Sequence, residues 1–262
     1  MRPTFPPNPF RRMLGIEIEI PQRGRCEATM PGLEASRDAT GLIAQGAVAT
    51  LCDITMGHAI GAQTTANEPF ATVHLQIAFH EAAGSGPLRG AGRCPALSPG
   101  WKEAMAACEI RRDDGGLVAT AQGFFARRPP GAERPAEPPA WEGAAPQSLS
   151  ALLGLRVVGE ELRMEVGGAL LNPDAVGHGG ALAAALDSAM RHALAQRGAG
   201  EAIALRTLDV RYILPALPGE VAIVPQVDRK GRAIHFAQAR ALGADGRTLC
   251  AAVGIYGGRL RS

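Results

Sequence analysis

Two long apolar stretches, each interrupted by one carboxylate, are the strongest pattern along this chain. From 47 to 62 the ionisable side chains besides Cys52 are Asp53 and His58, and the stretch 177–190 holds His178 and Asp187. A helix that is apolar on nearly all sides is a buried one. The pattern therefore predicts two buried helices, each carrying an Asp that is costly to bury unless it has partners or a chemical role.

The two predicted helices belong to a tandem repeat, because Asp187 follows Asp53 by 134 positions and the flanking segments match as well. In each copy an alternating strand and a loop precede the helix, and further alternating strands follow it. A glycine-containing turn precedes the last strand of each copy. The matched strands are 15–20 and 155–166, 75–79 and 208–212, and 117–125 and 248–256. A further strand is expected within the glycine-rich segment 83–99, by analogy with 220–227.

This repeat unit predicts an α+β fold in which an antiparallel sheet wraps around one apolar helix. Two such units could join their sheets edge to edge, which covers an edge strand of each. The segment between the copies is rich in Pro, Ala, Gly and Glu and is typical of an extended linker. We therefore expect an N-terminal domain at 1–127, a Pro-rich linker at 128–147 and a C-terminal domain at 148–262.

Composition narrows the class of protein. A net charge of +2 over 262 residues gives no strongly basic surface for nucleic acid. Residues 1–12 contain four prolines and no apolar run, so they match neither a signal peptide nor a membrane anchor. The five cysteines include no C-x-x-C pair, which favours free thiols in a reducing compartment over disulfides or a zinc site. We therefore expect a cytoplasmic protein with no metal, no membrane partner and no nucleic-acid partner.

The second copy carries a spaced motif that identifies a family. Asn172 precedes His178 by six residues, His178 begins a His-Gly-Gly turn, and Asp187 follows that His by nine. In the first copy the strand after the helix carries an apolar triplet, which begins with Leu75. Thr72 lies three residues before this Leu75. This arrangement resembles the hotdog-fold acyl-CoA thioesterases of the phenylacetate-pathway (PaaI) type. The resemblance covers both copies and implies tandem hotdog folds joined as a double hotdog.

In that family each active site is shared between two paired hotdog units. One unit gives the Asn, the His-Gly turn and the helix N-terminus, and the other gives the Asp and the Ser or Thr. Carried over here, the resemblance implies one complete catalytic site, with Gly180 as a further substrate-binding residue. Its catalytic members are Asp53, Thr72, Asn172, His178 and Gly179. Asp53 would act as general base or nucleophile, and both roles stay open.

The reciprocal site is degenerate in this sequence. The His position is Ala44, the first Gly position is Gln45, and the Ser or Thr position is Leu205. Asp38 stands where the Asn is expected and lacks an amide donor when ionised. Because only Asp187 is unchanged, the resemblance implies a pseudo-site around that residue.

The leading hypothesis is therefore hydrolysis of an acyl-CoA thioester to a carboxylic acid and free coenzyme A. Coenzyme A is part of the substrate, and no separate cofactor is expected. A homodimer of double hotdogs is expected, because single-unit relatives often form tetramers. Two alternatives remain, namely a hotdog hydratase or dehydratase acting on acyl thioesters, and a non-catalytic acyl-CoA-binding protein.

Overall fold

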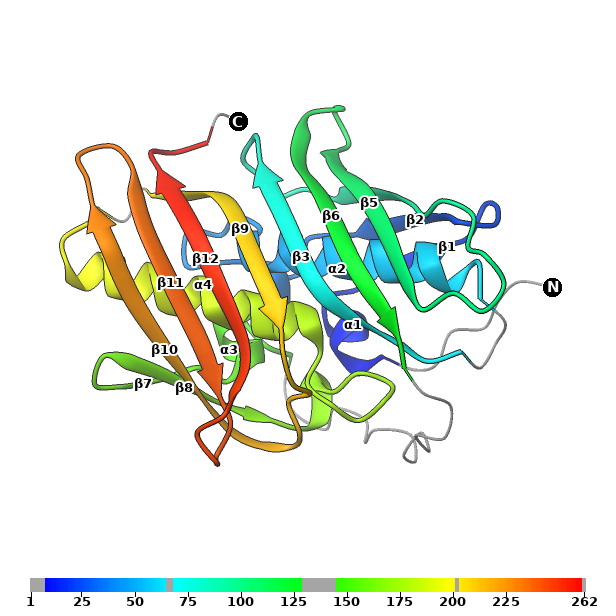
Figure 1. Ribbon diagram of the computed structural model, residues 1–262. Coiled ribbons are helices and arrows are strands. Elements are labelled where there is room, and N and C mark those ends of the chain that lie inside the picture. The colour runs from blue at the N-terminus through cyan, green and yellow to red at the C-terminus, as the bar shows by residue number, and fades with distance from the viewer. Residues whose placement is uncertain (1–7, 65–67, 129–144, 201–202, 261–262) are drawn as a thin grey trace.

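The computed structural model describes residues 8–64, 68–128, 145–200 and 203–260, and these form one twelve-stranded antiparallel sheet with two long helices (Figure 1). The sheet order is β1-β2-β4-β5-β6-β3-β9-β12-β11-β10-β8-β7. The strands are β1 (Glu17–Glu19), β2 (Arg25–Met30), β3 (Phe70–Phe79), β4 (Leu88–Arg93), β5 (Glu103–Arg112), β6 (Leu117–Arg127), β7 (Arg156–Val158), β8 (Glu161–Val166), β9 (Ala204–Tyr212), β10 (Gly219–Lys230), β11 (His235–Leu242) and β12 (Thr248–Gly257). The helices are α1 (Pro9–Met13), α2 (Gln45–Gly61), α3 (Leu149–Leu153) and α4 (Gly179–Gln196), with 3-10 turns η1 (Glu34–Ser36) and η2 (Gly168–Leu170). The α+β class is therefore confirmed.

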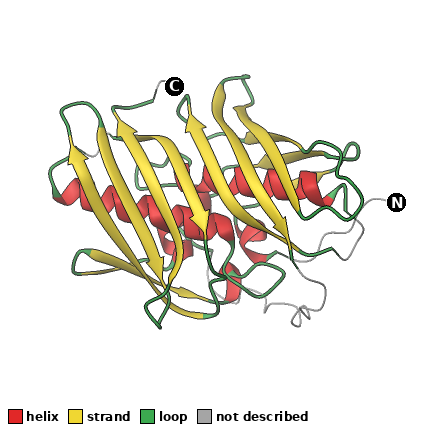
Figure 2. Ribbon diagram, in the orientation of Figure 1, coloured by secondary structure: helices red, strands yellow, loops and turns green. Residues whose placement is uncertain are grey.

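The two halves of the chain meet in the middle of the sheet. Strands β1 to β6 occupy one side and β7 to β12 the other, and β3 pairs antiparallel with β9, with Leu75 opposite Val210. The long helices α2 and α4 pack on the same face of this sheet (Figure 2). This pairing covers one edge strand of each half, and β1 and β7 remain at the two edges of the sheet.

Small residues allow α2 and α4 to pack closely. A Cβ on Gly180 would lie 2.8 Å from the Thr50 backbone, and a Cβ on Gly46 would lie 2.7 Å from the Ala184 Cβ. Gly46 and Gly180 are 134 positions apart, as are Thr50 and Ala184, so the two contacts are related by the sequence repeat. The repeat is therefore also present in the helix packing.

The glycine-rich segment 83–99 contains β4, which confirms the strand expected there. Its glycines allow the strand to lie close against α2. A Cβ on Gly90 or Gly92 would lie 2.7 Å from atoms of Thr55. The low β-propensity of glycine is thus offset by a close packing that larger residues would prevent.

The early part of each copy differs from the prediction. The expected strand at 155–166 is two strands, β7 and β8, paired antiparallel around a turn in which Gly159 has a φ of 65°. In the first copy the expected loop after 15–20 contains β2, which pairs with both β1 and β4. The proposed linker 128–147 lies mostly outside the described residues, as do residues 1–7 of the N-terminal segment.

The described residues include no helix long and apolar enough to cross a membrane. All five cysteines are free and buried.

Candidate active site

A cavity of about 500 Å³ lies between the two halves of the chain. The first half contributes α2, the start of β3 and the end of β6. The second half contributes the loop before α4, the first residues of α4 and the end of β9. Five predicted residues line this cavity, namely Asp53, Thr72, Asn172, His178 and Gly179. The structure thus brings together residues that are up to 126 positions apart (179 − 53 = 126).

Asp53 is a buried carboxylate on α2, with a relative exposure of 7%. Thr72, near the start of β3, donates a hydrogen bond from Oγ1 to Asp53 Oδ1 at 2.8 Å. Burial raises the pKa of Asp53 from 3.8 to about 6, while the Thr72 hydroxyl and the Gly180 amide act in the opposite direction. Asp53 is therefore mostly ionised at neutral pH, with a proton affinity suited to a general base.

His178 is the N-cap of α4. Its Nδ1 accepts a hydrogen bond from the Gly180 amide at 3.0 Å and lies 3.8 Å from Asp53 Oδ2. Burial lowers the pKa of His178 to about 4, so the ring is neutral at pH 7. Because Nδ1 is an acceptor here, the neutral ring carries its proton on Nε2. At neutral pH His178 thus fixes the turn and forms no charge pair with Asp53.

Gly179 is the first residue of α4 and lies close to Asp53. A Cβ on Gly179 would lie 3.1 Å from Asp53 Oδ2, so a larger residue would crowd the carboxylate. The Tyr212 hydroxyl, from the end of β9, donates to the Gly179 carbonyl at 2.9 Å. The amide N–H at this position has no intrahelical acceptor and lies at the positive end of the helix dipole. A partial negative charge beside Asp53 would therefore be stabilised here.

Asn172 and Gly180 have structural contacts of their own. Asn172 Oδ1 accepts hydrogen bonds from the amides of Asp174 at 2.9 Å and Val176 at 3.3 Å, so it holds the loop before α4. Gly180 lies where α4 packs against Thr50 of α2. It is not among the residues that line the cavity. Substrate contact through Gly180 stays a prediction.

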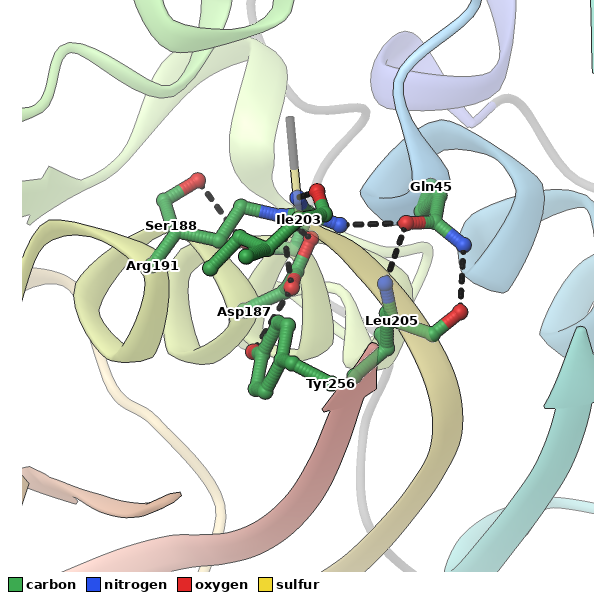
Figure 3. Close-up of polar contacts among 8 residues, drawn as sticks. Gln45, Asp187, Ser188, Arg191, Ile203, Leu205 and Tyr256 are labelled. Carbon is green, nitrogen blue, oxygen red and sulfur yellow. Dashed lines mark hydrogen bonds and ion pairs between the residues drawn. The ribbon is translucent and has the colours of Figure 1, made fainter. Parts of the chain in front are cut away.

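The counterpart site around Asp187 is filled by an arginine (Figure 3). Arg191 Nε lies 3.0 and 3.1 Å from the two Asp187 oxygens, and the Tyr256 hydroxyl donates to Asp187 Oδ1 at 2.9 Å. Arg191 also donates to the Ile203 carbonyl at 3.0 Å and to Gln45 Oε1. Each Asp187 oxygen thus has a partner within the protein.

Gln45 completes this cluster from α2. Its Nε2 donates to the Leu205 carbonyl at 2.8 Å, and its Oε1 accepts from the Leu205 amide at 2.7 Å. At this reciprocal site the resemblance implied a Gly where Gln45 stands and a Ser or Thr where Leu205 stands. These two residues therefore join the two halves of the chain through hydrogen bonds.

Arg191 was not identified from the sequence, although a signal was present. Arg191 follows Asp187 by four residues, and Gly57 follows Asp53 by four. Gly57 lines the open cavity, whereas the side chain of Arg191 fills the equivalent position of the other copy. Tyr212 was likewise missed as a site residue, and its counterpart in the first copy is Phe79, which has no hydroxyl. Extending the comparison of the copies beyond the motif would have found both.

Over residues 171–257 the chain matches the family model of the acyl-CoA thioesterase N-terminal domain. The matched residues lie in the second half of the chain and include α4 and the strands β9 to β12. For these residues the match bears out the prediction of an acyl-CoA thioesterase. The match does not distinguish the PaaI type from other acyl-CoA thioesterases, so that finer assignment stays a prediction. No curated protein matches the chain.

Solved structures resemble nearly the whole chain. A candidate oleoyl thioesterase of Lactobacillus plantarum has a TM-score of 0.64 at 12% identity, covering 91% of this chain and 98% of its own. The tesB protein of Mycobacterium avium subsp. paratuberculosis has a TM-score of 0.64 at 15% identity, covering 95% and 98%. A candidate thioesterase II of Thermobifida fusca has a TM-score of 0.65 at 15% identity, covering 97% and 98%. At these identities the likeness supports the hotdog fold and carries no assignment of substrate.

Proposed function

We propose that this chain is a double hotdog that hydrolyses an acyl-CoA thioester at one composite site. The two hotdog units would be residues 1–127 and 148–262, joined by the linker 128–147. The observation that carries the proposal is the asymmetry of the two buried aspartates. Asp53 faces an open cavity with Thr72 and Gly179 beside it, whereas Asp187 is paired with Arg191 and Tyr256.

The reaction consumes water and breaks the C–S bond, and it yields a carboxylic acid and the coenzyme A thiol. Asp53 either removes a proton from the attacking water or attacks the carbonyl carbon itself, and water then hydrolyses the resulting anhydride. Thr72 orients the Asp53 carboxylate through its 2.8 Å hydrogen bond. The developing oxyanion would be stabilised at the Gly179 amide by the N-terminus of α4. His178 and Asn172 keep that turn in place.

The phosphates of coenzyme A would lie at the exposed rim of the cavity. Arg128 lines the cavity, its side chain is about one-third exposed, and it pairs with Asp174 at 2.9 Å. A guanidinium is well suited to bind phosphate oxygens in a bidentate manner. On binding, the phosphate would replace the Asp174 carboxylate as the partner of Arg128.

A thiol-release assay with acetyl, aliphatic and aryl acyl-CoAs tests the proposal. We expect free coenzyme A to appear with at least one class and to be lost in Asp53→Asn. Turnover of enoyl-CoA without thiol release would instead support a hydratase. Ligand binding with no turnover of any substrate would support an acyl-CoA-binding protein. The expected homodimer and the cytoplasmic location stay predictions, and sedimentation analysis checks the first of these.

A further inference from the structure

Helix α2 contains two glycines that face the cavity. Gly57 and Gly61 are four residues apart, which places them on one side of the helix, and both line the cavity. A glycine inside a helix is less favourable than alanine by roughly 0.5–1 kcal/mol. In α4 the equivalent positions hold Arg191 and Ala195, so the fold itself does not require glycine there. A local choice that disfavours the helix is expected at a functional site.

The space beside Gly57 is bounded by two aromatic rings. A Cβ on Gly57 would lie 4.0 Å from both Phe125 Cε1 and Phe70 Cε2, which is an ordinary contact distance. The two rings pack edge to face with centroids 6.1 Å apart. A side chain longer than alanine at position 57 would therefore enter the cavity against these rings. The α4 copy shows such an occupied position, since Arg191 extends from it to reach Asp187.

Next to Asp53, the cavity wall is apolar. We call this part of the wall the apolar trough, and it is formed by Ile54, Gly57, Gly61, Phe70 and Phe125. From Asp53 to Gly61 the helix rises by about 12 Å at 1.5 Å per residue. His58 lines the same region, and burial lowers its pKa to about 4, so its ring brings no charge at pH 7. Besides Asp53, the charged residues that line the cavity are Glu68, Arg128 and Asp174. Arg128 is paired with Asp174, and Glu68 with Arg127.

We propose that the apolar acyl group of the substrate lies in this trough, and that Gly57 sets how large a group is accepted. The substrate class is then an acyl-CoA with an extended aliphatic acyl chain, in preference to acetyl-CoA. This inference rests on the proposed function, because it assigns the acyl subsite of the same cavity. Gly57 acts by leaving space beside Phe70 and Phe125.

Graded substitution at position 57 tests the proposal. Each methylene of substrate that the trough buries should raise kcat/KM about fourfold, from ~0.8 kcal/mol per CH₂. In Gly57→Ala the ratio of kcat/KM for the best long-chain substrate to that for acetyl-CoA should fall about fourfold, for one displaced methylene. In Gly57→Leu it should fall by about 200-fold, for four displaced methylenes, and the preferred chain should become shorter.

Two controls separate this effect from misfolding. Ala195→Leu, at the exposed end of α4, should leave the substrate ratio unchanged. Gly57→Ala should keep or raise Tm, because alanine favours the helix and meets no atom closer than 4.0 Å. An unchanged long-chain to acetyl ratio in both Gly57 variants, with folding intact, would overturn the proposal.

A binding experiment keeps the inference independent of turnover. Non-hydrolysable thioether analogues of acyl-CoA, titrated by calorimetry, should bind more tightly as the chain lengthens in the wild type. That dependence should be lost in Gly57→Leu. Absence of hydrolysis together with this binding pattern would refute the proposed function alone. If the enzyme hydrolyses acyl-CoA but binds the analogues with an affinity that does not depend on chain length, only the assignment of the trough as the acyl subsite is refuted.

Discussion

Replacing Asp53 by Asn should abolish turnover and at the same time stabilise the protein at neutral pH. Burial raises the pKa of Asp53 from 3.8 to about 6. Each pKa unit corresponds to 1.36 kcal/mol, so keeping this carboxylate ionised in the folded protein costs up to roughly 3 kcal/mol of unfolding free energy. Asparagine removes the charge and keeps an oxygen that accepts the hydrogen bond from Thr72. At neutral pH we therefore expect a gain approaching this amount.

The gain should depend on pH in a defined direction. A group whose pKa is raised on folding contributes stability below its unfolded pKa and loses that contribution as the pH rises through its folded pKa. Below pH 3.8 Asp53 is protonated in both states, so the variant and the wild type should differ little from this cause. The difference should grow between pH 4 and 6 and be complete above about 6.

Asp187→Asn is the matched control, and the sign of its effect on stability should be opposite. Asp187 is 4% exposed and bound to Arg191 and Tyr256. Removing one member of a buried ion pair destabilises by about 3–5 kcal/mol, and the partial exposure of Arg191 reduces the expected loss to roughly 2–3 kcal/mol. Turnover should persist in the folded fraction, because Arg191 and Tyr256 already bind the two oxygens of Asp187.

Urea unfolding at pH 5 and pH 8 together with thiol release measures all of these quantities. General base or nucleophilic catalysis by Asp53 predicts a loss of at least about 100-fold in kcat for Asp53→Asn. The reasoning fails if Asp53→Asn is less stable than the wild type at pH 8, or if its stability difference is the same at both pH values. It also fails if folded Asp187→Asn loses as much activity as Asp53→Asn.

Three further outcomes follow from contacts in the cavity and the helix crossing. In the wild type, kcat/KM should rise with pH through an apparent pKa near 6, because Asp53 must be ionised; a rate that is flat from pH 5 to 8 would contradict this role. Thr72→Val should lower kcat about 10- to 100-fold. It should also shift the apparent pKa upward, because the Thr72 hydroxyl lowers the pKa of Asp53, and a pH–rate profile measures both changes. Gly180→Ala should reduce the unfolding free energy by about 1–3 kcal/mol, since its Cβ would lie 2.8 Å from the Thr50 backbone. An unchanged urea midpoint would contradict this, because it would mean that α2 and α4 can move apart at no cost in free energy.

The repeat made much of this fold predictable. The helix expected at 47–62 is α2 at Gln45–Gly61, and β4 lies within the glycine-rich segment where its counterpart predicted a strand. Thr72 was implied by the family resemblance, and its hydroxyl contacts Asp53. The helix and the strand follow from local pattern and from correspondence between the copies, which a sequence carries directly.

What the sequence left open depends on contacts made only after the halves assemble. In the sequence, Arg191 is consistent with a surface charge on α4. Only the folded structure shows that it bonds to Asp187, Ile203 and Gln45. The use of Asn172 Oδ1 within its own loop depends on a tight turn in which Ala175 has a φ of 52°, which its residue type does not favour. Tertiary packing and local backbone conformation decided these points.

The pairing of β3 with β9 within one chain has an evolutionary consequence. A dimer of identical hotdog units is bound by its symmetry, since any residue placed at one interface site appears at the other as well. In such a dimer the position of Gly57 and Arg191 would hold the same residue at both sites, so both would be open or both filled. Fusion into one polypeptide removes that constraint, because each copy acquires substitutions of its own. The site at Asp53 could then stay open to a ligand, while the site at Asp187 acquired Arg191 and Gln45, whose hydrogen bonds join the two halves.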